Sequence, residues 1–107
     1  MILVHIPWAV NPFRGEKFAE GWASAAEAAM DYGALSWGFF RAIDGRLDFI
    51  QHATFPSKAH FERYWYSETI AAKRVELQGY FNVPVLPEIY EVVGEGRALT
   101  LAPEEPS

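Results

Sequence analysis

The chain of 107 residues contains no cysteine, has few basic side chains and has no long apolar run. The lack of cysteine excludes disulfide bonds, thiolate nucleophiles and cysteine-ligated metal or iron–sulfur sites, and it fits a reducing compartment. Nine basic against 14 acidic side chains give a net charge of −5, which repels the phosphates of nucleic acids. The N-terminal apolar stretch is interrupted at His5, Pro7 and Asn11, before it reaches the length of a signal peptide or membrane span. We therefore expect a cytoplasmic protein that binds neither nucleic acid nor membranes.

What the chain does have is a large apolar and aromatic content. Half of its residues are apolar and 16% are aromatic, whereas 21% are charged. This composition predicts a folded domain with an aromatic core, at a size where many folds gain stability by pairing with a second copy. We expect one domain over residues 1–93, followed over 94–107 by a Gly-, Pro- and Glu-rich tail that crosses the surface or is disordered.

The first half of the chain predicts a strand, a helix and a hairpin. Residues 2–10 are apolar on both faces and stop at Asn11-Pro12, which is typical of a buried central strand. Residues 16–32 predict a helix that stops at Gly33. Its apolar stripe has spacings of three and four and comprises Phe18, Trp22, Ala25, Ala29 and Tyr32. Two alternating runs, 35–42 and 46–54, flank Asp44-Gly45, which suits a two-residue type I′ turn because both central positions need positive φ.

The second half predicts a helix and a last strand. Ser57 follows Pro56 and is suited to cap a helix that runs to about Gln78, where Gly79 acts as the stop. Ser67-Glu68 is a second capping point and indicates a kink or break within this helix. Residues 88–93 alternate in polarity and predict the last strand. The expected core stripe of the helix comprises Phe61, Trp65, Ala72 and Val75.

The element order β-α-β-β-α-β predicts an α+β fold of the ferredoxin-like type. In this fold an antiparallel four-stranded sheet carries both helices on one face. The strands have large apolar residues on both faces, so the uncovered face also needs a partner. We expect a homodimer in which the two sheets face each other.

Three short motifs occur in a fixed order along residues 2–93. Residues 11–18 (Asn-Pro-Phe-Arg-Gly-Glu-Lys-Phe) form a loop into the first helix, and residues 33–37 (Gly-Ala-Leu-Ser-Trp) enter the second strand. The turn Phe55-Pro56-Ser57 precedes Phe61 and Ser67 in the second helix. Together these motifs resemble the antibiotic biosynthesis monooxygenase-like family of the dimeric α+β barrel superfamily, with its Pro-Gly loop, aromatic-x-Ser turn, helix aromatic and mid-helix serine. The family's usual tryptophan in this turn is Phe55 here.

The resemblance also implies a type of chemistry. Members that degrade heme have an axial histidine late in the second helix, and the matching position here is about Arg74. Arginine cannot act as a neutral imidazole ligand. The resemblance therefore points to the branch that needs no cofactor, whose members oxidise aromatic phenols to quinones with dioxygen in a pocket between sheet and helices.

Such an oxygenase needs a base for the phenolic proton and donors for the resulting anion. His52, on the third strand among apolar neighbours, is the candidate base, with a core or interface histidine as the alternative. His5 lies on the first strand and joins His52 only if the strand register brings the two together. The histidines lack metal-ligand spacing, so we expect no metal site. His60 lies in the first turn of a helix, where we expect it to be exposed.

The remaining candidates are aromatic residues and one arginine. Tyr64 and Trp65 offer a hydroxyl and an indole N–H that could position a planar aromatic substrate, and Phe61 adds an apolar wall. Trp22 lies among alanines that could leave a cavity, unless aromatic side chains opposite fill it. Arg74 could pair an anionic substrate group or form an ordinary surface ion pair. For each aromatic residue, plain core packing is the alternative.

Three functions remain open at this point. The first is a cofactor-free monooxygenase that acts on a small hydroxylated aromatic or polyketide-like compound, with catalytic His52, Tyr64 and Trp65. The second is a non-redox isomerase, cyclase or dehydratase of the same superfamily with His52 or His5 as the acid/base. The third is a dimer without enzymatic activity that binds a small ligand or is purely structural.

Overall fold

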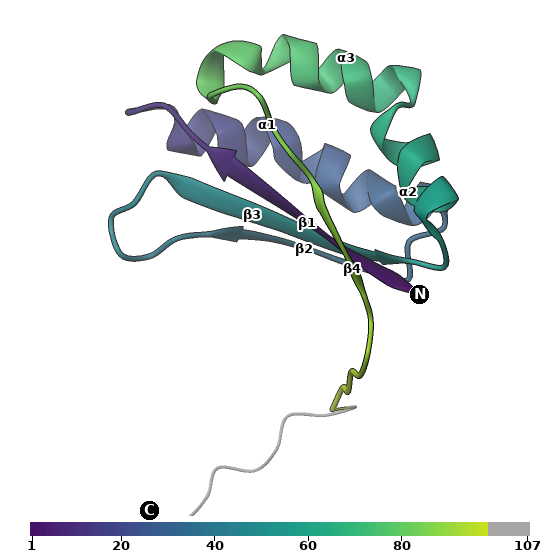
Figure 1. Ribbon diagram of the computed structural model, residues 1–107. Helices are drawn as coiled ribbons and strands as arrows, with labels where there is room; N and C mark the ends of the chain where they lie inside the picture. The colour runs from purple at the N-terminus through teal and green to yellow at the C-terminus, as the bar shows by residue number, and fades with distance from the viewer. Residues whose placement is uncertain (99–107) are drawn as a thin grey trace, which may run out of the picture.

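The computed structural model describes residues 1–98 and has an antiparallel sheet with all helices on one face (Figure 1). The strands are β1 (Ile2–Ala9), β2 (Ser36–Arg41), β3 (Asp48–Phe55) and β4 (Glu88–Glu91), in the spatial order β2-β3-β1-β4. The helices are α1 (Gly15–Glu27), α2 (Lys58–Trp65) and α3 (Glu68–Glu76), with short 3₁₀ segments at Ala28–Tyr32 and Gln78–Tyr80. The predicted ferredoxin-like fold is thus confirmed. No helix within residues 1–98 has the length and apolarity to cross a membrane.

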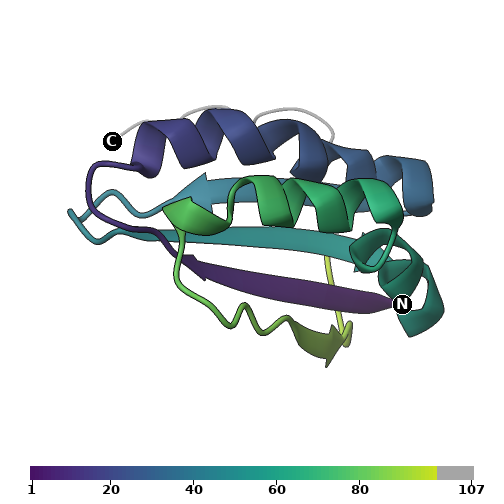
Figure 2. The same cartoon turned by 90° about the horizontal axis from the view of Figure 1, so that it is seen from above.

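The two faces of the sheet differ in what covers them. Side chains alternate along the central strands, so one set points toward the helices and the other away from them. The helix face is buried and comprises Val4, Ile6 and Trp8 from β1 with Phe49, Gln51, Ala53 and Phe55 from β3. The open face comprises the alternate residues, and none of α1, α2 and α3 covers it: all three lie on the other side of the sheet in Figure 1, and Figure 2 looks down on that helix side. It includes Leu3, His5, Pro7, Phe40, Ile50, His52, Thr54 and Tyr90.

Aromatic rings fill the space between sheet and helices. The predicted first helix is confirmed, although its last turn is 3₁₀, and Gly33 ends it in the left-handed region at φ 90°. Trp22 is fully buried, and its ring centroid lies 4.8 Å from that of Trp8. The ring of Trp8 also contacts Phe18 at 5.1 Å and Phe81 at 4.9 Å. The alanines beside Trp22 therefore accommodate rings from the opposite side rather than border a ligand cavity.

The second predicted helix is broken at Ser67, as expected. Ser67 Oγ accepts a hydrogen bond from the Ile70 N–H at 3.3 Å and caps α3. Ser57 is the N-cap of α2, but its hydroxyl bonds His60 Nδ1 at 2.7 Å instead of a backbone N–H. This bond holds His60 half-buried, whereas the sequence predicts an exposed side chain.

The break also changes which residues of α3 face the core. Ala72 and Val75 were expected in the core stripe, but Ala72 is exposed and Val75 is 71% exposed. Ile70 and Leu77 are buried instead. A break in a helix resets its rotational phase, so a stripe extended from α2 through Ser67 predicts the wrong face.

The hairpin between β2 and β3 is wider than predicted. Regular pairing ends at Arg41 opposite Phe49, and the Ala42 N–H donates to the Asp48 carbonyl at 3.0 Å. Gly45 has φ 85°, but Asp44 does not have positive φ, which rules out a type I′ turn. The Asp44 carboxylate accepts hydrogen bonds from Arg46 N at 3.2 Å and Arg46 Nε at 2.7 Å. These bonds support the wider loop.

The strand ends differ slightly from the sequence-based expectation. The third strand starts at Asp48 rather than at residue 46, and β4 ends at Glu91 rather than at residue 93. Residues 94–98 are exposed and belong to no helix or strand. The rest of the predicted tail, 99–107, lies outside the described residues.

Candidate functional site

Two histidines form a pair on the open face of the sheet. The register places His5 of β1 directly opposite His52 of β3. His5 Nδ1 and His52 Nε2 share a hydrogen bond of 2.9 Å, and the two ring centroids are 5.0 Å apart. The structure thus settles the register that the sequence left open and brings both predicted residues together.

The environment of this pair favours a neutral His52. Burial lowers the pKa of His52, and the neighbouring His5 lowers it further because two adjacent positive charges repel. His5 Nε2 lies 3.9 Å from Glu88 Oε1 of β4, so a positive charge on His5 would face a carboxylate. A neutral imidazole beside a partner that can share its proton is suited to act as a general base.

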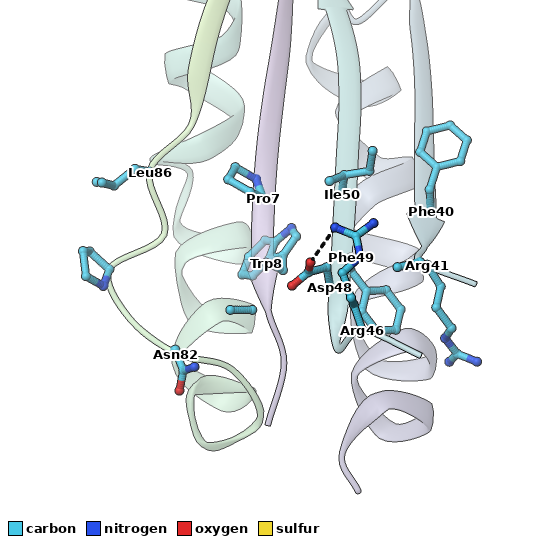
Figure 3. A pocket seen from close by; sticks show the side chains of 13 residues that line it. Pro7, Trp8, Phe40, Arg41, Arg46, Asp48, Phe49, Ile50, Asn82 and Leu86 are labelled. Carbon is cyan, nitrogen blue, oxygen red and sulfur yellow. Dashed lines mark hydrogen bonds and ion pairs between the residues drawn. The ribbon is translucent and has the colours of Figure 1, made fainter. Parts of the chain in front are cut away.

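An apolar groove lies next to the histidine pair on the same face, with a volume of about 490 Å³ (Figure 3). We call it the open-face groove. Pro7 and Ile50 are one strand repeat from His5 and His52, and in Figure 3 they lie between Leu86 at one edge of the groove and Phe40 at the other. Polar groups are present at one end, where Arg46 Nη1 pairs with Asp48 at 3.1 Å. The full lining is Pro7, Trp8, Ala9, Phe40, Arg41, Ala42, Arg46, Asp48, Phe49, Ile50, Asn82, Pro84 and Leu86.

Phe40 connects the groove to the histidine pair. Its ring lines the groove and also contacts the His52 ring edge-on, at a centroid distance of 5.6 Å. Gly38, which pairs with His52 across the sheet, makes this position possible. A Cβ at Gly38 would lie 2.5 Å from Phe40 Cζ, so the ring occupies the space of the missing side chain. A planar compound in the groove would therefore lie near His52.

The predicted aromatic site residues lie on the other face of the sheet. Tyr64 is fully buried, and its hydroxyl donates to the Ala25 carbonyl at 2.7 Å while it accepts from Gln51 Nε2 at 2.9 Å. Burial raises the pKa of Tyr64 to about 12, so the hydroxyl keeps its proton at neutral pH. Gln51 Oε1 accepts from Trp22 Nε1 at 2.8 Å. The polar groups of Tyr64 and Trp22 thus bind the protein itself.

Phe61, Trp65 and Arg74 form a stack at the junction of α2 and α3. The Phe61 and Trp65 rings stack at a centroid distance of 5.9 Å, and the Arg74 guanidinium lies 4.0 Å from the Trp65 ring centroid. Arg74 Nη1 also donates to the Trp65 carbonyl at 2.7 Å. The surface ion pair considered for Arg74 is not present among the described residues.

The structure therefore divides the predicted site residues between two faces. His5 and His52 lie on the open face, whereas Trp22, Phe61, Tyr64 and Trp65 lie behind the sheet and Arg74 lies on α3. A single pocket that joins all seven is not what this fold forms. Sequence reasoning missed Phe40, Glu88 and Gln51. The alternation of Gln51 with Phe49 and Ala53 was the available signal that a polar side chain enters the core.

No family model matches the sequence, and no curated protein matches it. Solved structures do share its fold. A candidate antibiotic biosynthesis monooxygenase from Nitrosomonas europaea is 14% identical with a TM-score of 0.79, over 88% of this chain and 100% of that one. SnoaB, a cofactor-independent oxygenase from Streptomyces nogalater, is 12% identical with a TM-score of 0.74, over 88% and 94%. A candidate antibiotic biosynthesis monooxygenase from Bordetella bronchiseptica is 18% identical with a TM-score of 0.73, over 86% and 96%.

Within residues 1–98, no group of three potential metal-ligating side chains occurs.

The solved structures above bear on the architecture of the chain and not on a particular reaction, because sequence identity is low throughout. The chain therefore has the ferredoxin-like fold of the antibiotic biosynthesis monooxygenase structures, which confirms the predicted resemblance at the level of the fold.

Proposed function

We propose that the protein is a homodimeric, cofactor-independent monooxygenase in which a small hydroxylated aromatic compound binds in the open-face groove and His52 removes its phenolic proton. The observation that carries this proposal is the 2.9 Å contact between His5 and His52 beside an apolar groove of about 490 Å³. A groove of this size suits a compound of two or three fused rings. The oxygenase fold of SnoaB supports the choice of reaction class.

A second copy of the chain would complete this site. The open face carries apolar side chains that the monomer leaves half in solvent, such as Phe40 at 49% and Tyr90 at 50% exposure. Two such faces packed together would bury these rings and enclose the groove between the sheets. Enclosure excludes water, which strengthens the electrostatic interactions of a phenolate inside.

The reaction balances without an external reductant. A naphthol-type substrate loses its phenolic proton to His52, and the resulting anion gives electrons to dioxygen with a new C–O bond at the carbon para to the hydroxyl. The peroxide takes back one proton from the histidine pair. Its O–O bond then breaks as the C–H proton at the same carbon is removed, the distal oxygen leaves as water, and a quinone remains. The ring loses four electrons and dioxygen gains four, with one oxygen atom in the quinone and one in water.

The histidine pair provides a path for the proton. When His52 Nε2–H donates to His5 Nδ1, the lone pair of His52 Nδ1 is free to accept the substrate proton. His52 can then pass its Nε2 proton to His5 across 2.9 Å, and the resulting charge on His5 faces Glu88 at 3.9 Å. His52 thus returns to its neutral form, and Glu88 stabilises the displaced charge.

The test is oxygen uptake with a panel of naphthols and dihydroxynaphthalenes. We expect turnover by the purified dimer to fall at least about 100-fold in His52→Ala, the usual cost of losing a general base. His60→Ala is the matched control, because His60 is bonded to Ser57 away from the groove. Equal rates in the two variants would refute the role of His52, and a monomer in solution would refute the enclosed site.

A non-redox reaction remains the second candidate because the pair of imidazoles with Glu88 moves protons and contains nothing specific to dioxygen. In that case His52→Ala would abolish isomerisation or cyclisation of an enolisable ketone under anaerobic conditions. If His52→Ala instead lowers the stability of the protein and changes no activity, the protein is a ligand-binding or structural dimer.

A further inference from the structure

A second groove lies along α3 and is separate from the open-face groove. It has a volume of about 270 Å³ and lies between α3 and the connector that leads to β4. We call it the α3 groove. Its lining is apolar except for Arg74 and Gln78, and it comprises Ala71, Arg74, Val75, Gln78, Phe81, Val83 and Val85. Val75 and Val83 are 71% and 62% exposed, so the groove presents unsatisfied apolar surface.

Arg74 lines this groove, and no carboxylate within residues 1–98 pairs with its guanidinium. Within residues 1–98, no acidic oxygen lies within 4.0 Å of its guanidinium, whereas the adjacent Lys73 pairs with Glu76 at 2.9 Å. The guanidinium is half-buried against Trp65, and this burial lowers the pKa of Arg74, as expected for a partly desolvated charge without an acidic partner.

Part of the guanidinium remains available to a ligand. Arginine has five N–H donors in a planar fork, and one Nη1 hydrogen of Arg74 is used by the Trp65 carbonyl at 2.7 Å. That bond and the stacking on Trp65 fix the plane of the group, so little conformational freedom is lost when an anion binds. A carboxylate matches the remaining fork, because it accepts two parallel N–H bonds.

The geometry points to the α3 groove as a binding site for a small monocarboxylic acid with an apolar body, held at its carboxylate by Arg74. The volume is just below the usual range for drug-sized ligands, which suits a medium-chain fatty acid or an arylalkanoate. The valines and Phe81 would cover the apolar body, and Gln78 adds a polar group to the lining. This site shares no lining residue with the open-face groove and stands independently of the function proposed above.

Calorimetric titration of the full chain with octanoate and with octanamide tests this assignment. The two probes differ in charge but hardly in size, so we expect octanoate to bind at least about 10-fold more tightly, within the range of one charge-assisted pair. Arg74→Gln should remove this preference, and Arg74→Lys should recover only part of it, because lysine lacks the planar fork. Arg63→Gln, at an exposed position of α2, should bind octanoate as the wild type does.

Two results would overturn the assignment. One is equal affinity of the wild type for octanoate and octanamide, or no binding of either, a comparison that needs no folded variant. The other is unchanged octanoate affinity in Arg74→Gln. Octanoate binding that His52→Ala reduces and Arg74→Gln does not would place the ligand in the open-face groove instead.

Discussion

Replacement of Gln51 by leucine tests the polar contacts that cross the aromatic core. Gln51 is fully buried and bonds Trp22 Nε1 at 2.8 Å and the Tyr64 hydroxyl at 2.9 Å. In Gln51→Leu the Trp22 N–H has no acceptor, which costs about 1–3 kcal/mol. The Tyr64 hydroxyl keeps its hydrogen bond to the Ala25 carbonyl and loses only the one to Gln51, which costs about 0.5–1.5 kcal/mol, the net value of one hydrogen bond. We expect the free energy of unfolding to fall by about 2–4 kcal/mol.

Urea unfolding followed by circular dichroism measures this change. Gln78→Leu is the control, because Gln78 is exposed and a substitution there should stay within about 0.5 kcal/mol of the wild type. A double-mutant cycle with Tyr64→Phe should show coupling, since each change removes one end of the same hydrogen bond. A Gln51→Leu variant as stable as the control, or effects of Gln51→Leu and Tyr64→Phe that simply add, would contradict the role given to these hydrogen bonds.

Two further predictions concern the histidine pair and the end of the first helix. The lowered pKa of His52 means that the unfolded chain binds more protons below the ordinary value of 6.5, so stability should fall as the pH drops from 6.5 toward the lowered pKa. In His52→Gln this fall in stability below pH 6.5 should be absent when urea unfolding is measured at several pH values. A pH profile equal to that of the wild type would contradict the lowered pKa of His52. Gly33→Ala should cost about 1–2 kcal/mol because φ is 90° and the new Cβ would lie 2.9 Å from His60 Cδ2. Gly79→Ala, which meets open space, should be nearly neutral in thermal unfolding; equal effects would disprove the strain at Gly33.

The order of elements could be predicted because its signals are local. Alternation marked the strands, and Ser67 marked the break between α2 and α3 through a capping bond that spans three residues. The hairpin loop could not be predicted from Asp44-Gly45 alone. The side chain of Asp44 binds Arg46, and this contact competes with the backbone conformation that the dipeptide usually adopts.

The site required information that the sequence does not carry locally. His5 and His52 are 47 residues apart, and a shift of one residue would have put them on opposite faces. The hydroxyl of Tyr64 and the indole of Trp65 suggest a ligand pocket, yet the space beside Trp65 is occupied by Trp8, which comes from a distant part of the chain and packs in turn on Phe81. Core volume is a collective property, and single residues do not reveal it.

The connector before β4 borders both grooves. Its side chains alternate, so that Phe81, Val83 and Val85 line the α3 groove while Asn82, Pro84 and Leu86 line the open-face groove. One short segment is thus a wall shared by two cavities. A ligand that shifts this segment on one side reshapes the cavity on the other, and thermodynamic linkage requires the effect to be reciprocal. Any coupling between the two cavities would therefore pass through residues 81–86, which contribute alternate side chains to each of them.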